Sequence, residues 1–329
     1  MDNRLTRRRL SDFLAYEWIL MIIVAVAAII VLELAYTVAA TRLSTGQQFK
    51  YYLDETLYSF DASDKSVYDL LGVETGKNGK TFSYDVLSVE TENLTSSYNV
   101  NVLSVRLSVQ EGDAIFTSSV EEEGESVRAR QIMDENPVYY LEDLLVRAEN
   151  YLKPFTVNGE VYNENDYDET KIRDYFDARM KGDKRFRTEA EKEEGRQNEV
   201  GRIMKLAGEV KDFKTLLSVD EEKGLFYRYT KYEQSYNENP DDENYKTAYE
   251  QEKAERENRI YGINMGALTH APDRTDKKSV SEYLKIAGTD SAQNVVLVLF
   301  DFGEYQPDLQ FESISFVNTL VREFSDILG

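Results

Sequence analysis

Seven residues are candidates for binding a ligand, because each lies at or just beyond the end of a predicted strand. They are Asp113, Thr117, Ser118, Tyr261, Asn264, Asp301 and Glu304. In open α/β sheets, ligands bind in a crevice at the carboxyl ends of the strands. Carboxylates there can clamp hydroxyl or amino groups, and tyrosine rings can stack on sugars. The pattern therefore predicts a binding site.

The residues that usually carry catalysis or hold metals are scarce. The chain has no cysteine, which excludes disulfides, thiolate metal sites and cysteine nucleophiles. Its one histidine, His270, lies in the loop-like run Thr-His-Ala-Pro, so a histidine metal cage is excluded. The sequence has no nucleophile elbow, phosphate-binding glycine loop or zinc-binding helix motif. We therefore expect no enzymatic activity, no cofactor and no metal.

The charge and composition of the chain exclude some classes of binding partner and some classes of protein. The formal net charge of −22 repels phosphate backbones, so nucleic acid is not an expected partner. With 41% hydrophobic residues, including 23 tyrosines, the chain is too rich in core-forming residues to be disordered. The absence of cysteine excludes a lipid-modified anchor and favours a bacterial exterior, because secreted animal domains usually carry disulfides.

One segment is apolar enough to cross a membrane. Residues 18–32 are uninterrupted apolar, and the run continues to Ala40 with Glu33 as its single break. As a helix, residues 18–40 would be roughly 34 Å long, enough for a hydrocarbon core of about 30 Å. Four arginines precede this span, so the positive-inside rule places the N-terminus in the cytoplasm. We expect a cytoplasmic tail (1–17), one transmembrane helix (18–40) and an extracytoplasmic domain (41–329) of a single-pass cell-membrane protein.

Two other interpretations of the N-terminus compete with a retained helix. In the first, Val38, Ala39 and Ala40 form the cleavage site of a signal peptide, although Glu33 would separate that site from the apolar core. In the second, the arginines of residues 6–10 belong to a twin-arginine export signal, although Ser11 replaces the apolar residue usual there.

Strand and helix patterns alternate at both ends of the outer domain, which predicts an α/β fold. Residues 294–300 are apolar on both faces, as in a central strand covered by helices. Residues 102–109 fit either a strand or a helix face. The other predicted strands are 49–55, 82–90, 114–117 and 259–264, and the predicted helices are 63–71, 137–153, 280–286, 311–328 and an amphipathic segment that follows Thr188.

Several of these segments resemble extracytoplasmic solute-binding proteins of the two-lobed, periplasmic type II fold. Residues 49–55, 67–71 and 84–89 resemble the opening units. Residues 103–117, with Glu-Gly-Asp before Ala-Ile-Phe-Thr, resemble the helix and strand before the crossover, which implies a helix at 102–109. The Tyr-Gly-Ile of residues 261–263 is similar to a strand of the second lobe, and residues 294–300 and 311–328 resemble the return and closing helix.

The resemblance implies one lobe made of residues 49–116 and 290–329, and a second made of 120–285. Two departures are the helical anchor, where a lipid-modified cysteine or cleaved signal is usual, and charged insertions within residues 158–258. The implied function is that of a membrane-tethered ligand-binding or sensing module, with a small molecule as ligand and a membrane transporter as a further partner.

The alternative function is that of a non-enzymatic structural or assembly protein of the cell envelope, which binds another protein. A cleft lined by aromatic and acidic residues would favour the ligand-binding module. A flat or filled cleft beside an exposed apolar patch would favour the assembly protein.

The first testable prediction is that the apolar helix is retained in the mature protein. Its long apolar run lacks a good cleavage site, so chains extracted from membranes should keep their N-terminal residues. N-terminal sequencing of the extracted protein measures this directly. Chains that begin at Thr41 would show that the segment is a cleaved signal.

Overall fold

The computed structural model describes residues 18–39, 47–57, 66–71, 81–82, 86, 88–94, 97–121, 127–183, 186–228, 239, 241–256, 259–302 and 311–328. The chain divides into two units, Met1–Ser44 and Thr45–Gly329. The predicted cytoplasmic tail, residues 1–17, lies outside the described residues.

In the first unit, the apolar segment forms helix α2, Trp18–Ala39. The large apolar side chains described for it, from Trp18 to Leu34, are exposed. Within the described part of the chain, no helix is both long and apolar enough to cross a membrane. The transmembrane span at residues 18–40 therefore stays a prediction.

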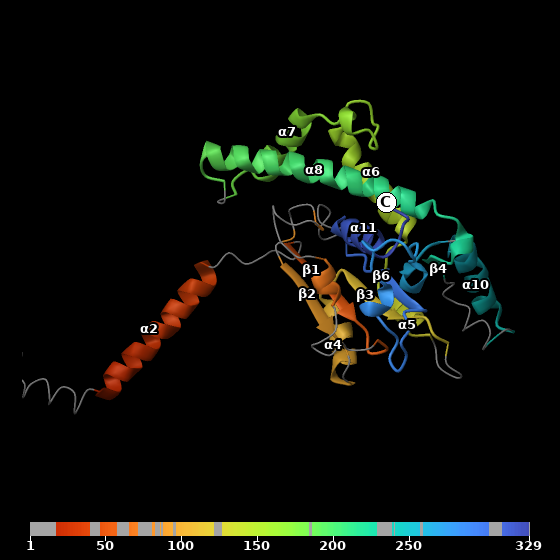
Figure 1. Cartoon of the computed structure of the whole chain (residues 1–329). Helices are drawn as coiled ribbons and strands as arrows, with labels where there is room; N and C mark the ends of the chain where they lie inside the picture. Colours follow the sequence, from red (N-terminus) through yellow and green to blue (C-terminus); the bar gives the residue numbers. More distant parts are fainter. Residues whose placement is uncertain are drawn as a thin grey trace, which may run out of the picture. The chain divides into compact units, whose positions relative to one another are not determined.

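The described strands of the second unit form one six-stranded mixed sheet in the order β2-β1-β3-β6-β5-β4 (Figure 1). Four strands, β1, β2, β3 and β5, run in one direction, and β6 and β4 run in the other. This sheet and its helices confirm the predicted α/β class. The strands are β1 Gln48–Leu53, β2 Ser88–Asn93, β3 Ala114–Ser118, β4 Phe226–Tyr227, β5 Gly262–Asn264 and β6 Val295–Leu299.

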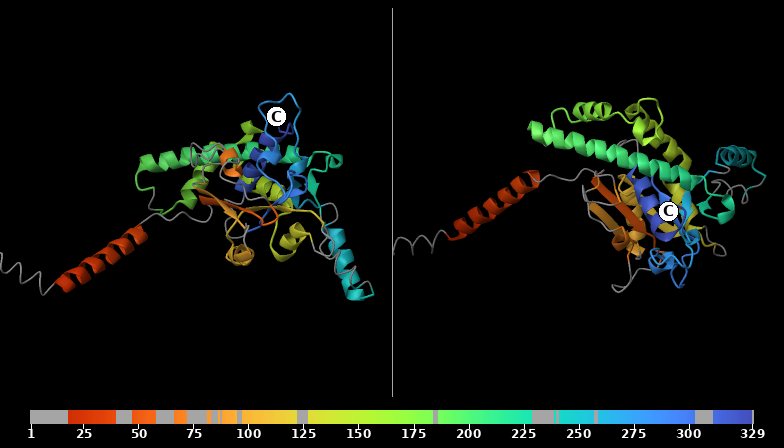
Figure 2. Two further views of the ribbon diagram at one scale, coloured as in Figure 1. Left: turned by 60° about the horizontal axis from the view of Figure 1, so that its bottom comes forward. Right: turned by 45° about the horizontal axis from the view of Figure 1, so that its top comes forward.

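Helices cover both faces of the sheet, α6, α8 and α11 on one and α4 and α5 on the other (Figures 1 and 2). Side chains alternate between the faces, so Tyr51 packs in the first core and Tyr52 in the second. The helices are α3 Val67–Leu70, α4 Ser97–Ser108, α5 Arg128–Glu135, α6 Leu141–Leu152, α7 Glu169–Arg179, α8 Glu189–Leu217, α10 Glu243–Arg256 and α11 Glu312–Phe324.

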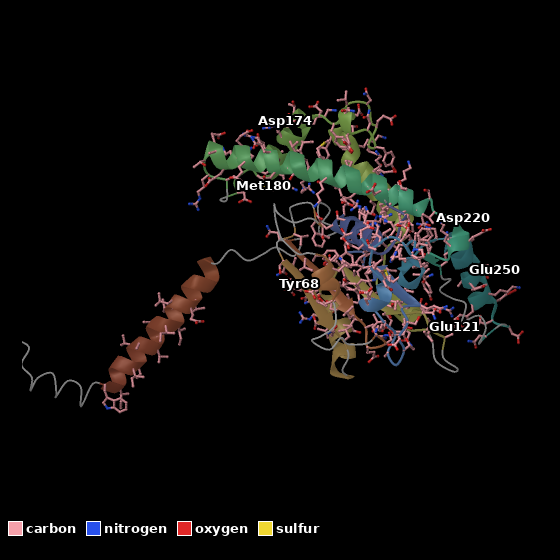
Figure 3. The ribbon with its side chains drawn as sticks, in the orientation of Figure 1. Tyr68, Glu121, Asp174, Met180, Asp220 and Glu250 are labelled. Atoms are coloured by element: carbon pink, nitrogen blue, oxygen red, sulfur yellow. The ribbon has the colours of Figure 1, made fainter. Side chains whose placement is uncertain are left out.

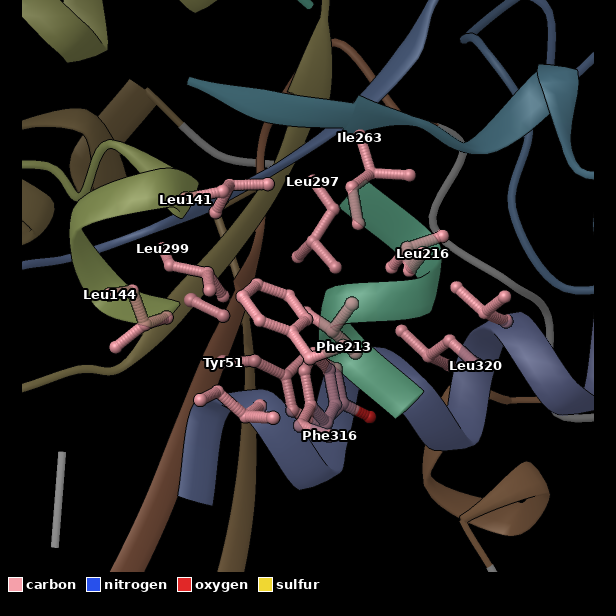
Figure 4. Packing of buried hydrophobic residues seen from close by; sticks show 14 of the residues in the cluster. Tyr51, Leu141, Leu144, Phe213, Leu216, Ile263, Leu297, Leu299, Phe316 and Leu320 are labelled. Atoms are coloured by element: carbon pink, nitrogen blue, oxygen red, sulfur yellow. The ribbon is translucent and has the colours of Figure 1, made fainter. Parts of the chain in front are cut away.

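The first core is centred on α11, which lies between the sheet and α8 (Figure 4). The ring of Phe316 is 4.7 Å from that of Phe49 and 5.7 Å from that of Tyr51, measured between ring centroids. Phe213 of α8 is buried in the same cluster. Helix α11 therefore links the sheet to the long helix α8, and aromatic rings contribute to this contact.

A polar network also joins α8 to α11. Arg322 donates to Glu209 at 2.9 Å and to Asp212 at 2.5 Å. Asn318, which is buried, donates to the backbone carbonyl of Glu209 at 2.7 Å and to its carboxylate at 2.8 Å. Because both carboxylates and the amide nitrogen of Asn318 find partners, the network fixes how α8 lies along α11.

One end of the sheet is the exposed edge strand β2, which pairs with β1 alone among the described strands. Its Glu90 is exposed and lies 3.4 Å from the ammonium group of Lys50 on β1, and Glu92 lies 3.3 Å from the same group.

Elsewhere on the surface, charged side chains such as Glu250 project from α10 (Figure 3).

The two-lobed arrangement expected from the resemblance is not observed in the described residues. Strand β6 pairs with β3 on one side and with β5 on the other, so strands from both predicted lobes lie in one sheet. Residues 45–329 form a single unit. An apolar strand needs a neighbour on each side, and here the second neighbour comes from the segment predicted to form the other lobe.

The prediction that the late strand packs with the early part of the chain is confirmed by the pairing of β6 with β3. The early strands expected beside it, residues 49–55 and 84–89, were the wrong neighbours, because β1 pairs with β2 and β3, and neither β1 nor β2 pairs with β6. Three other predictions can be compared with the structure. Residues 102–108 lie in α4, as the resemblance implied, and residue 109 follows the helix. The strand predicted at 82–90 is β2, which begins only at Ser88, and the helix predicted at 280–286 is the single 3₁₀ turn Val280–Glu282.

The second prediction concerns this core. Residues 45–329, produced without the first 44 residues, should fold cooperatively, because this unit has its own core. In that chain, Phe316→Ala should lower the free energy of unfolding by about 3–5 kcal/mol, because a large buried ring is lost. Urea unfolding followed by circular dichroism measures both.

The matched control is Val157→Ala, whose side chain is exposed and should change the free energy of unfolding by less than about 0.5 kcal/mol. Equal losses for the two variants, or a chain without a cooperative transition, would contradict the proposed core and its boundary.

Candidate functional site

The sheet has two ends where predicted site residues gather. We name the end with the carboxyl ends of β1, β3 and β5 the carboxyl edge, and the opposite end, where β6 finishes, the amino edge. The predicted site residues divide between them because β6 runs against its neighbours. Thr117, Ser118 and Asn264 lie at the carboxyl edge, Asp113, Tyr261 and Asp301 lie at the amino edge, and Glu304 lies outside the described residues.

At the carboxyl edge, the space between β1 and β3 is filled by the chain's own side chains. The chain passes from β1 to β2 on one side and returns to β3 on the other, which makes this the switch point where ligands often bind. Asp54 is fully buried there and accepts hydrogen bonds from Thr117 at 3.1 Å and Thr56 at 2.9 Å. Arg128 of α5 pairs with Asp54 at 3.1 Å. Thr117 therefore has a structural role.

A second part of the carboxyl edge holds a cavity of about 610 Å³ beside Asn264. Hydroxyl and amide groups line it, among them those of Thr269, Ser281 and Gln293, and its described lining has one carboxylate, Asp290, and no aromatic ring. The side chain of Asn264 donates to the carbonyl of Gly224 at 2.7 Å, and Ser118 accepts from the amide of Val120 at 3.1 Å. This cavity therefore lacks the aromatic lining expected of the site.

The amino edge brings Asp301 to a partner that the sequence did not reveal. Residues 137–139 run beside the end of β6, where the amide of Asp301 donates to the carbonyl of Pro137 at 3.0 Å. Helix α6 begins directly afterwards and carries Arg147. Its guanidinium donates to the carboxylate of Asp301 at 2.9 Å and lies 5.4 Å from the ring centroid of Tyr139.

These groups border a cavity of about 400 Å³, which we name the Arg147–Asp301 pocket. Among the described residues, its polar lining consists of Ser108, Gln110, Arg147 and Asp301, and its apolar lining consists of Leu107, Pro137 and Phe302. The ring of Phe302 stacks on that of Phe300, with centroids 6.0 Å apart. The pocket thus combines the acidic and aromatic lining that the sequence led us to expect of a ligand site.

Local backbone geometry shapes one wall of the pocket. Gln110 has a positive φ of 60° where α4 ends, a conformation that is uncommon for residues other than glycine. Gly112 follows with φ 119°, and a Cβ atom there would lie 2.3 Å from the ring of Tyr52. The Glu-Gly-Asp motif therefore needs its glycine to bring the chain from α4 into β3.

Electrostatic interactions beside the pocket favour the charged form of Arg147 and the neutral form of Tyr139. Burial alone would lower the pKa of Arg147, but the hydrogen bond and charge of Asp301 raise it overall. Burial raises the pKa of Tyr139, and the nearby charge of Asp301 raises it further. Arg147 is therefore charged, and Tyr139 neutral, across the neutral pH range.

Asp113 also lies at the amino edge, but its carboxyl group affects the stability of the fold rather than the pocket. Burial raises the pKa of its carboxyl group to about 7, and the charge of Glu312 adds to this. The backbone amide of Lys50, which donates to the carboxylate at 2.7 Å, opposes the shift. Asp113 therefore takes up a proton in the folded state near neutral pH.

Tyr261, the remaining predicted site residue, is buried in the second core. Its hydroxyl lies 3.2 Å from that of Tyr140, and the two rings are 4.9 Å apart. The guanidinium of Arg259 lies over the ring of Tyr140, 4.3 Å from its centroid. Tyr261 is therefore a core aromatic residue.

The third prediction follows from Asp113. Its pKa is higher in the folded state, about 7, than its ordinary value of 3.8, so between these values the folded state binds more protons than the unfolded state. Stability should therefore fall as pH rises from about 4 to 7, by at most about 1.4 kcal/mol per pH unit from this group. Asp113→Asn should remove this component, and urea unfolding at pH 5, 6, 7 and 8 measures it.

The control is Asp326→Asn, because Asp326 pairs with Arg274 at a site far along the chain from this edge. That variant should keep the fall in stability between pH 5 and 7. If Asp113→Asn has the same pH profile as the unchanged chain, the buried carboxyl group does not titrate in this range.

Comparison with known proteins adds no family to this geometry. No family model, no curated protein and no solved structure matches the chain.

Proposed function

We propose that the chain is a membrane-tethered, extracytoplasmic module that binds a small ligand in the Arg147–Asp301 pocket. The observation that carries the proposal is the lining of this pocket, in which an ion pair and an aromatic ring border one cavity of about 400 Å³. Ligand sites in proteins are typically cavities of this size, mostly apolar with a few fixed polar groups.

The pocket supports binding rather than a reaction. Its charged groups neutralise each other at 2.9 Å, so neither is poised as a general acid or base. Ser108, the hydroxyl in the lining, donates to the carbonyl of Val105 at 2.7 Å. In the described lining, no base is hydrogen-bonded to this hydroxyl to activate it as a nucleophile.

The tether rests on the sequence of residues 18–40 and on the arginines before it. The module needs no second lobe, because the pocket lies against one sheet and its helices. A preformed pocket of this kind binds without the hinge closure that two lobes require. A transporter partner would therefore meet one single-sheet unit rather than two closing lobes.

One observation favours the assembly protein as the second candidate. Val105 and Val109 lie one turn apart on and just beyond α4, and their side chains are 63% and 66% exposed. Two neighbouring exposed apolar residues beside the pocket could contact another protein. This candidate uses the same end of the molecule, so one experiment can separate the two.

The fourth prediction uses the absence of cysteine. A single cysteine in the pocket lining, Ser108→Cys, should react with a membrane-impermeant maleimide on intact cells. Millimolar probes from four classes, namely sugars, amino acids, organic acids and diamines, should include one that slows this labelling severalfold, because a bound ligand covers the thiol. Mass spectrometry of the labelled chain gives the rate.

Two controls fix the meaning of the result. Val157→Cys is exposed and is not part of the pocket lining, so it should label on intact cells at a rate that no probe changes. Asn3→Cys should label only after lysis. Labelling of Ser108→Cys only after lysis contradicts the extracytoplasmic placement, and protection by none of the four classes contradicts the pocket's role.

A further inference from the structure

The ligand chemistry of the pocket follows from its two charges. We propose that the Arg147–Asp301 pocket, taken as the binding site of the proposed function, accepts an α-amino acid with an apolar side chain. The ligand carboxylate would bind Arg147, its ammonium group would bind Asp301, and its side chain would lie against the apolar wall. Each part of this assignment rests on a separate feature of the site.

The first feature is the binding capacity left on the ion pair. The bond to Asp301 uses one of the five N–H groups of Arg147, whose side chain is 43% exposed. A guanidinium fork matches a carboxylate with two parallel hydrogen bonds. The carboxylate of Asp301, 21% exposed, also interacts with the hydroxyl of Tyr139, and its two oxygens have about four acceptor positions, so it can accept from an ammonium group as well.

The second feature is the spacing of the two charges. The donor atom of Arg147 and the acceptor atom of Asp301 are 2.9 Å apart. In an α-amino acid, the ammonium and carboxylate groups are attached to the same carbon, so they lie at a similar separation. When such a ligand binds, its two charges and those of Arg147 and Asp301 form a square, in which each charge has two neighbours of opposite sign. Stacking on Tyr139 holds the guanidinium in place before the ligand arrives.

The third feature is discrimination against singly charged ligands. An anion bound to Arg147 would lie beside the negative charge of Asp301, and it would approach a chain of net charge −22. A cation bound to Asp301 would lie beside Arg147. Each of these ligands meets one attractive and one repulsive charge, whereas a zwitterion meets two attractive ones.

The fourth feature is the apolar wall. Leu107, Pro137 and Phe302 supply the remaining lining, and Phe302 is supported from behind by Phe300. In its described residues this wall has no charged group to meet a charged ligand side chain, but it can bury a branched or aromatic one. A cavity of about 400 Å³ accommodates a single amino acid of this kind.

Isothermal titration calorimetry of the full chain in detergent micelles tests the inference with three probes that share one side chain. These are leucine, which is zwitterionic, leucinamide, which is cationic, and 4-methylpentanoate, which is anionic. Leucine should bind at least tenfold more tightly than either singly charged probe. Equal affinities for the three, or no heat with any of them, would overturn the inference.

Charge variants assign the two ends of the ligand. Arg147→Gln should weaken leucine binding at least tenfold and should improve the relative affinity for leucinamide. Asp301→Asn should weaken leucine binding similarly and should improve the relative affinity for 4-methylpentanoate. The matched control, Arg274→Gln, removes an arginine that pairs with Asp276 outside the pocket, and leucine binding should not change.

If Arg147→Gln loses its thermal unfolding transition, Arg147→Lys replaces it, because lysine keeps the positive charge beside Asp301 but lacks the guanidinium fork. It should weaken leucine binding while leaving the order of the probes unchanged. If all variants bind leucine as the unchanged chain does, the pocket is not its site.

The outcome separates this inference from the proposed function. Protection of Ser108→Cys by sugars, organic acids or diamines, but not by amino acids, would leave the binding module in place and reject the amino acid as its ligand. Protection by no class would reject both.

Discussion

The architecture depends on the burial of strand β6. All five of its residues are buried, and the strand is apolar on both faces. It can be stable only with a strand on each side and helices on both faces, which β3, β5, α11 and α5 provide. Because β6 runs against its neighbours, its carboxyl end lies at the amino edge of the sheet. That reversal is what brings Asp301 beside α6 and creates the pocket with Arg147.

The sequence predicted the parts of the fold that depend on burial. The apolar run of residues 294–300 indicated a covered central strand, and β6 is one. The helix of residues 311–328 was also predicted, and the structure has it as α11. Apolar patterns report how deeply a strand is buried but not its direction or its neighbours. Both the two lobes and the single shared site depended on that missing information, and neither is observed in the described residues.

The residues of the candidate site were likewise predicted only in part. Asp301 was predicted because it follows a strong strand, but Arg147 lies on the exposed side of an amphipathic helix, where arginines usually meet solvent. Its role depends on residues 137–139 running beside β6, a contact of high sequence separation. Asp54 and Arg128 were missed for a related reason. Asp54 was assigned to the predicted strand itself, and no pattern in the sequence joins it to an arginine 74 residues away.

The acidic edge strand β2 affects how copies of the chain meet one another. An uncovered strand offers a row of backbone groups that can pair with the same strand of a second molecule. Glu90 and Glu92 give this row a negative face, and Lys50, which partly neutralises them, belongs to the neighbouring strand and is nearly buried. Two such edges brought together would repel each other, and the repulsion acts only within about 8 Å at physiological ionic strength. The acidic edge strand therefore disfavours the joining of sheets from two copies of the chain.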